Sequence, residues 1–160
     1  MDQQEDTMAT RTASTQPTNS SFFRFEDLRV YTKATDYAAW LAAQVASPRT
    51  DSEKNIATTF LRSAFDISLN IAEGSSRSKS QFDHYLKISK TAIRECVVYG
   101  EVCRTIGFFD NEQYEQSREY LMELTRMLGA LIISLQRSSD RRHDRDDDAG
   151  DYAAGDDMSY

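Results

Sequence analysis

Apolar side chains recur at three- and four-residue intervals along four stretches of the chain, with polar residues at the positions between them. Such spacing is typical of one face of an amphipathic α-helix. It predicts helices at residues 27–46, 51–73, 79–105 and 111–136. No stretch alternates single apolar and polar residues as a half-buried strand does. We therefore expect an all-α protein.

Signals at the ends of these stretches support the boundaries. Pro48 cannot continue the first helix. Gly74 and Gly107 are expected to end the second and third helices in the left-handed conformation, which glycine adopts without steric cost. Three helix starts carry a pair with the spacing of a capping box: Thr50 with Glu53, Ser78 with Gln81, and Asp110 with Gln113. Short connections then predict an antiparallel up-down-up-down four-helix bundle over residues 22–136.

The two ends of the chain differ from this body. Residues 1–21 and 137–160 lack apolar periodicity and cannot bury enough surface to offset the entropy of ordering, so we predict that both are disordered. The formal net charge of the chain is −7, and the last segment holds eight Asp and four Arg. The acidity is thus concentrated in the ends, and an acidic chain can still carry a local basic surface.

Membrane and secretory signals are missing from the pattern. No run approaches the ~18 apolar residues of a membrane span, and the N-terminal MDQQEDTMAT has no basic start followed by an apolar run. We therefore expect a cytoplasmic protein that does not enter a membrane. Cys96 and Cys103 are ~10 Å apart along a helix, too far for a disulfide, so we expect two buried thiols.

The second predicted helix carries more apolar surface than an isolated bundle needs. Leu61, Phe65 and Leu69 form a row separate from its main stripe, and the whole apolar arc is about twice the ~100° required. Tyr37 and Trp40 lie beside the main stripe of the first helix in the same way. Scattered exposed apolar residues are common on monomers, but a contiguous row indicates a contact surface. We predict a homo-oligomer with these five residues at its contacts.

A polar strip follows the remaining side of the second helix: Arg62, Asp66, Asn70 and Glu73. The structural interpretation is a hydrogen-bonded edge of the bundle, where Asn70 sets register and Glu73 meets a charge from a neighbouring helix. The alternative is that Glu73 is a ligand or a catalytic carboxylate. We favour the structural interpretation.

Five basic residues but only one acidic residue lie between positions 77 and 94: Arg77, Lys79, Lys87, Lys90 and Arg94. The last three recur at helical spacing on one stripe, and the first two lie at the start of that helix, where free N–H groups suit phosphate. The simpler interpretation is a solvated face with an Asp83–Lys87 pair. The alternative is a nucleic-acid site that contacts the backbone, since stacking aromatics are not interleaved.

The sequence contains no residue pattern typical of a catalytic site or of a metal site. A metal site in a bundle needs inward-facing Glu-x-x-His pairs, but Gln81 stands three residues before His84, and His143 lies outside the predicted bundle. The serines near residue 76 have no paired His and carboxylate, and no glycine-rich phosphate loop is present. We expect no metal, no cofactor, no small-molecule substrate and no enzymatic activity.

Three segments carry a family resemblance: FEDLRVY at 25–31, SLNIAEGSSRSKSQF at 68–82 and IGFFD at 106–110. They resemble the four-helix-bundle proteins encoded in intervening sequences of 23S ribosomal RNA genes, a family similar to the accessory protein of diversity-generating retroelements. The resemblance covers residues 22–136, and its most specific part is NIAEG followed by Arg77, Ser78 and Phe82. The family usually has a proline shortly before this motif, where the chain has Ser68, so a kink there is not carried over.

The resemblance implies a homopentameric ring of bundles and no known enzymatic activity. It also implies a role that is largely uncharacterised, with nucleic acid and a reverse transcriptase as partners of the retroelement relatives. Together with the surface argument, it leads us to expect an oligomeric scaffold or interaction module. The alternative is a nucleic-acid-binding accessory protein that uses the basic residues of the third helix.

Overall fold

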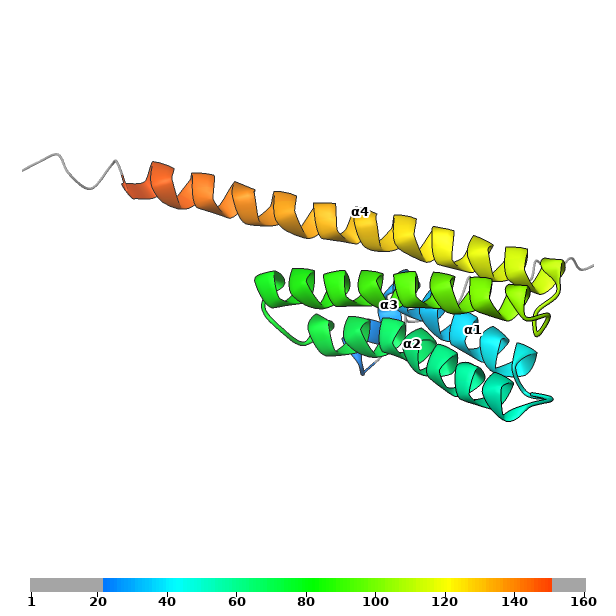
Figure 1. The fold of residues 1–160 in the computed structure, drawn as a ribbon. Coiled ribbons are helices and arrows are strands. Elements are labelled where there is room, and N and C mark those ends of the chain that lie inside the picture. The colour runs from blue at the N-terminus through cyan, green and yellow to red at the C-terminus, as the bar shows by residue number, and fades with distance from the viewer. Residues whose placement is uncertain (1–21, 151–160) are drawn as a thin grey trace, which may run out of the picture.

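The computed structural model describes residues 22–150, which form four α-helices and one short 3-10 helix (Figure 1). The elements are η1 (Arg24–Asp27), α1 (Arg29–Gln44), α2 (Asp51–Ser75), α3 (Lys79–Thr105) and α4 (Asn111–Gly150). No strand occurs among the described residues, so the predicted all-α class with four helices is confirmed. The predicted bounds of the first three α-helices lie within two residues of the observed ones.

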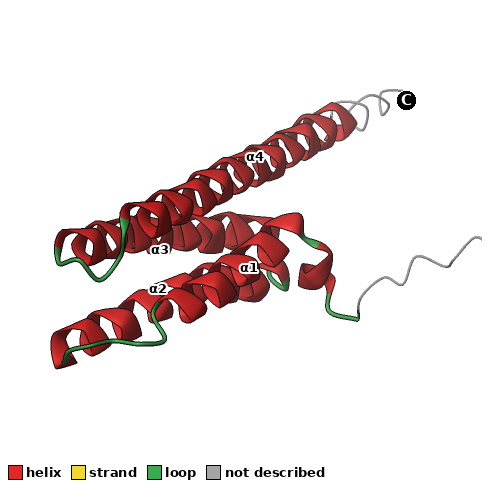
Figure 2. Cartoon of the chain, turned by 90° about the vertical axis from the view of Figure 1, so that its right-hand side faces the viewer, coloured by secondary structure: helices red, strands yellow, loops and turns green. Residues whose placement is uncertain are grey.

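Each helix packs against the next one along the chain, and α4 also packs against α1. The contact between α2 and α3 is the most extensive of these four. Figures 1 and 2 show short loops joining neighbouring helix ends, with α1 and α2 on one side of the molecule and α3 and α4 on the other. Every α-helix therefore has two α-helical neighbours within the chain, and η1 packs in addition against α1 and α2.

The core lies between the four helices, and its largest side chains are fully buried: Tyr37, Leu41, Phe60, Ile67, Ile71, Leu86, Leu124 and Leu128. Burial of one such aliphatic or aromatic side chain contributes roughly 1.5–3 kcal/mol. Phe109, in the α3–α4 loop, closes one end of this core, with its ring centroid 6.0 Å from that of Phe60 and 6.4 Å from that of Trp40.

Two of the three predicted capping pairs are confirmed in full. The Ser78 hydroxyl accepts a bond from the Gln81 N–H while the Gln81 side chain accepts one from the Ser78 N–H. Asp110 and Gln113 are bonded in the same reciprocal way at the start of α4. The Thr50 hydroxyl also accepts the N–H of Glu53, but the return bond is absent because Glu53 binds Arg49 instead.

The role predicted for Gly74 is wrong. Its φ is not positive, and α2 continues through it to Ser75. A Cβ at this position would lie 2.6 Å from the Tyr85 Cβ and 2.8 Å from the Phe82 Cδ2 of α3. The glycine is therefore required by the close approach of α2 to α3. Gly107, with φ 71°, is the left-handed residue that follows α3, as predicted.

The predicted end of the fourth helix near residue 136 is also wrong. The α4 helix continues to Gly150 and projects beyond the other three (Figure 1). Residues 137–149 contain neither proline nor glycine, so nothing in the sequence interrupts the backbone hydrogen bonds. The structure thus continues α4 through residues 137–150, and the disorder predicted for this segment stays a prediction. The same prediction for residues 1–21 and 151–160 lies outside the described residues.

Candidate interaction surfaces

The apolar side chains beside the main stripe of α1 are used inside the bundle. Tyr37 is fully buried, and its hydroxyl lies 3.0 Å from the Ser117 hydroxyl on α4. Trp40 is half-buried, with its ring centroid 5.6 Å from that of Tyr120. The prediction that Tyr37 lies at an oligomer contact is therefore wrong, and Trp40 packs against its own core. The physical reason is that α1 has two neighbours, α2 and α4, and needs a wide apolar arc to meet both.

The corresponding row on α2 faces outward. Phe65 is 46% exposed and Leu69 is 60% exposed, whereas Leu61 is half-buried against the core. A shallow cleft continues the row toward the start of the described chain, where Leu69 lies beside Phe22 and Phe23, two further exposed aromatics. This surface, called here the α2 outer row, consists of Leu61, Phe65 and Leu69. Its use in an oligomer stays a prediction.

The polar strip of α2 has local bonding partners. The Asn70 side-chain amide donates to the backbone oxygen of Asp66, 2.7 Å away and one helical turn earlier. Glu73 forms its ion pair with Arg77, four residues later, and not with a charge on a neighbouring helix as predicted. Arg62 is exposed. The strip therefore stabilises the end of α2, and Glu73 lines the cleft beside Leu69 with its charge paired to Arg77.

One polar contact was missed by the sequence analysis. Arg49 donates from its guanidinium to Glu53 and also to the backbone oxygen of Gly107, 2.8 Å away in the α3–α4 loop. The Glu53 side chain is buried beneath it, and the hydrogen bonds from Arg49 lower the pKa of this carboxyl. The contact ties the start of α2 to a loop more than fifty residues later, which no local pattern could reveal.

The five basic residues between positions 77 and 94, four of them on α3, are partly neutralised. Arg77 pairs with Glu73, Lys87 pairs with Asp83 as predicted, and Lys79 donates to the Ser138 hydroxyl of α4 at 2.8 Å. The two remaining members, Lys90 and Arg94, form no ion pair within the described residues. The five residues thus do not act as one uniform stripe, and the uncompensated charge is at its C-terminal half.

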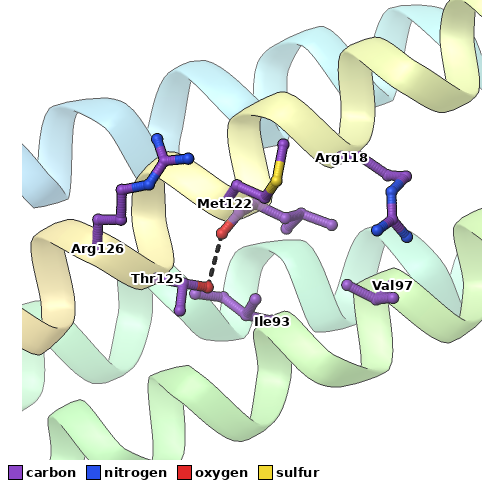
Figure 3. A pocket seen from close by; sticks show the side chains of 7 residues that line it. Ile93, Val97, Arg118, Met122, Thr125 and Arg126 are labelled. Carbon is purple, nitrogen blue, oxygen red and sulfur yellow. Dashed lines mark hydrogen bonds between the residues drawn. The ribbon is translucent and has the colours of Figure 1, made fainter.

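A groove of about 260 Å³ lies between α3 and α4 beside this half of the stripe. Its lining is mostly apolar, with Ile93 and Val97 from α3 and Leu121 and Met122 from α4. Figure 3 shows Arg118 and Arg126 of α4 at opposite ends of the groove, with Met122 between them. The groove was not foreseen, because the helical spacing of each stretch is visible in the sequence but the pairing of two distant stretches is not.

Thr125 supplies the only hydroxyl on the lining of this groove, and it donates to the backbone oxygen of Leu121, 2.7 Å away (Figure 3). Its only hydrogen-bond donor is therefore used within α4, and the hydroxyl oxygen can still accept. A ligand in the groove would meet an apolar floor and two cationic ends, without a nucleophile or a free acid.

The two thiols are buried and unreactive in character. Burial raises the pKa of Cys96 to about 12 and that of Cys103 to about 11. Both remain protonated at neutral pH, and a protonated thiol is a poor nucleophile and a poor metal ligand. Within the part of the chain that the structure describes, no group of three His, Cys, Asp or Glu side chains could hold a metal ion.

A family model for the 23S rRNA-intervening sequence protein matches residues 26–130. The chain belongs to this family. The match covers about two thirds of the chain and includes the α2 outer row, the basic residues of α3 and the α3–α4 groove. It leaves out Phe22, Phe23 and α4 beyond residue 130. A comparison with curated proteins found no match.

Membership of the 23S rRNA-intervening sequence protein family agrees with the fold and names no chemistry. The described helices offer two kinds of surface to a partner: the apolar α2 outer row, and the α3–α4 groove with the cations Arg118 and Arg126 at its ends. None of the helices in residues 22–150 has the length and apolar character needed to cross a membrane. A functional role for the described helices therefore depends on these two surfaces.

Proposed function

We propose that this protein is a non-enzymatic, self-associating four-helix bundle that serves as a scaffold or interaction module in the cytoplasm. Its helices follow one another in an antiparallel up-down-up-down order, and copies assemble through the α2 outer row. The homopentamer implied by the sequence resemblance is the form we propose. The observation that supports this most strongly is the exposure of Phe65 and Leu69 on neighbouring turns of one helix.

Energetics favour covering this surface. Phe65 and Leu69 lie four residues apart, so their side chains are adjacent on the helix. Full burial of each contributes roughly 1.5–3 kcal/mol, and a closed ring would bury the row of every copy. Phe22 and Phe23 extend the same apolar surface past the end of the row, which enlarges the area that a second copy could cover.

The test is sedimentation of the Phe65→Ser/Leu69→Ser double variant beside the unmodified chain. We expect the unmodified chain to sediment as a multiple of 18.3 kDa and the double variant to sediment as a single chain with unchanged helicity. The matched control is Val98→Ser/Ile133→Ser, which removes two apolar side chains of similar exposure from α3 and α4. Single chains in the unmodified sample, or loss of assembly in the control alone, would contradict the proposal.

A second candidate function is nucleic-acid binding through the backbone phosphates. It is supported by four cations that form no ion pair within the described residues, Lys90 and Arg94 on α3 and Arg118 and Arg126 on α4, two helices that pack together. The Lys87 part of the predicted stripe contributes less, because Asp83 compensates its charge. Binding of this kind weakens steeply with salt, since each phosphate contact releases a counterion.

The test of this second function is the binding of single- and double-stranded RNA and DNA at two salt concentrations. We expect Lys90→Glu/Arg94→Glu to reduce the affinity for all sequences alike and to flatten its salt dependence. The control is Lys54→Glu, which reverses an exposed charge on α2, away from this face. No binding at low salt, or equal loss in the control, would exclude the basic face as the site.

A further inference from the structure

The α3–α4 groove combines an apolar floor with two cations, Arg118 and Arg126, that form no ion pair within the described residues. The pKa of the Glu101 carboxyl is lowered mainly by its hydrogen bond from Arg104, and the charge of Arg118 lowers it further. Arg118 is held over the ring of Tyr114 and donates to its hydroxyl, a neutral partner. Arg126 is exposed, and neither arginine forms an ion pair within the described part of α4 or its neighbours. Because the two arginines are eight residues apart in α4, their Cα atoms are ~12 Å apart along the axis.

These features select the chemistry of the ligand. A volume of about 260 Å³ exceeds the ~150 Å³ of an apolar cavity that accepts benzene, so an aromatic side chain fits. The floor consists of aliphatic and methionine side chains, which adapt to apolar peptide side chains. No aromatic ring lines the groove to stack on a base, as single-stranded nucleic acid requires. The groove therefore suits an anionic peptide with apolar side chains.

The chain itself contains such a segment. Residues 151–160, DYAAGDDMSY, carry three aspartates and no basic residue, and they include three large side chains with apolar surface: Tyr152, Met158 and Tyr160. We propose that this acidic C-terminal segment binds in the α3–α4 groove, with its carboxylates on Arg118 and Arg126 and an apolar side chain on the floor. Occupancy would also neutralise Arg118 and Arg126 and so reduce the positive charge available to nucleic acid.

The length of the segment beyond Gly150 determines whether it can come from the same copy or must come from a neighbouring one. From Arg118 to Gly150, α4 advances 32 residues, or ~48 Å. A fully extended chain covers at most ~3.3–3.6 Å per residue, so Tyr160, ten residues past Gly150, stops roughly 10 Å short of the Arg118 end of its own groove. The segment must therefore come from a neighbouring copy. This arrangement rests on the proposed self-association, but the affinity of the groove for the segment does not.

The experiment measures binding of a fluorescent, N-acetylated peptide of residues 151–160 to the chain ending at Gly150. That chain retains every core residue, because the core lies within residues 30–132. We expect saturable binding that Arg118→Gln/Arg126→Gln weakens by about tenfold, since charge-assisted pairs are lost. The Lys54→Gln control removes an exposed cation of α2 and should leave the affinity unchanged.

Two peptide variants test the mode of binding without altering the protein. Replacing both Asp156 and Asp157 by Asn should weaken binding as the arginine variant does. Replacing Tyr152, Met158 and Tyr160 by Ser keeps the charge and should also weaken it, because the floor loses its contact. Equal binding of this serine peptide, equal loss in the Lys54→Gln control, or no binding at low salt would overturn the proposal. Because the peptide is supplied separately, failure here leaves the sedimentation test of self-association unaffected.

Discussion

The first two helices present the same pattern and have different surroundings. Each has a main apolar stripe and a second set of apolar residues beside it, yet Tyr37 on α1 is fully buried while Leu69 on α2 is 60% exposed. The second side of α1 faces α4, whereas the second side of α2 faces no α-helix and meets only the η1 segment beside Leu69. A wide apolar arc therefore indicates burial somewhere, and only the arrangement of the neighbours shows whether the covering surface belongs to the same chain.

The most direct test of this difference is to truncate one residue on each helix, Tyr37 on α1 and Leu69 on α2. We expect Tyr37→Ala to lower the free energy of unfolding by ~3–5 kcal/mol, as large core truncations do, with the Ser117 hydroxyl also losing its partner. Leu69→Ala, measured where the chain is monomeric, should change it by no more than ~0.5 kcal/mol, as surface substitutions do. Urea unfolding followed by circular dichroism measures both, and similar losses would show that the two rows are equivalent.

Substitutions at Gly74 and Gly129 test whether the close approach of α2 to α3 determines which side of α2 faces outward. Gly74→Ala should lower the free energy of unfolding by ~1–3 kcal/mol, because the new Cβ would collide with Tyr85 and force α2 away from α3. Gly129, inside α4, has no neighbour within 4 Å of a built Cβ. Gly129→Ala should therefore stabilise the chain by ~0.5–1 kcal/mol through helix propensity. A stable Gly74→Ala variant would mean that the α2–α3 approach does not determine which side of α2 faces outward.

The smallest of the expected effects concerns the Arg49–Glu53 contact, which holds the start of α2 against the α3–α4 loop. The pKa of Glu53 is lowered in the folded chain by the hydrogen bonds from Arg49, so this contribution to stability is present above the unfolded value of ~4.3. It is lost as the pH falls through the lowered pKa. We expect Glu53→Gln to reduce stability at neutral pH and to weaken its decline toward acid.

The measurement is the midpoint of urea unfolding at a series of pH values from 7 down into the acid range. The control is Glu112→Gln, which removes an exposed carboxylate of α4. If the Glu53→Gln chain and the control show the same dependence on pH, the Arg49–Glu53 contact does not hold the start of α2 in place.

Local sequence patterns predicted the elements well and their partners poorly. The Ser78–Gln81 capping box and the α3 bounds were predictable because they depend on residues three apart and on unbroken spacing. Glu53 was assigned to its own helix start, but its partner came from the residue before that start. The role of Gly74 was misjudged because glycine serves both turns and close approaches, and only the position of Tyr85 decides between them.

The candidate surfaces divide in the same way. Phe65 and Leu69 were identified from spacing alone, since a row on one helix needs no knowledge of its neighbours. Arg118 and Arg126 were missed because they acquire meaning only where α4 lies beside Ile93 and Val97. The partial neutralisation of the basic residues was foreseen for Lys87, whose partner is one turn away, and not for Lys79, whose partner is on α4.

By itself the amino-acid sequence determined four helices, most of their ends and the excess of apolar surface on α1 and α2, because helix periodicity and capping act over a few residues. The tertiary structure decided that α1 uses its excess against α4, that α2 leaves its excess exposed, and that a cationic groove forms between α3 and α4. These outcomes depend on which helices become neighbours, and that is set by the summed packing of residues far apart in the chain.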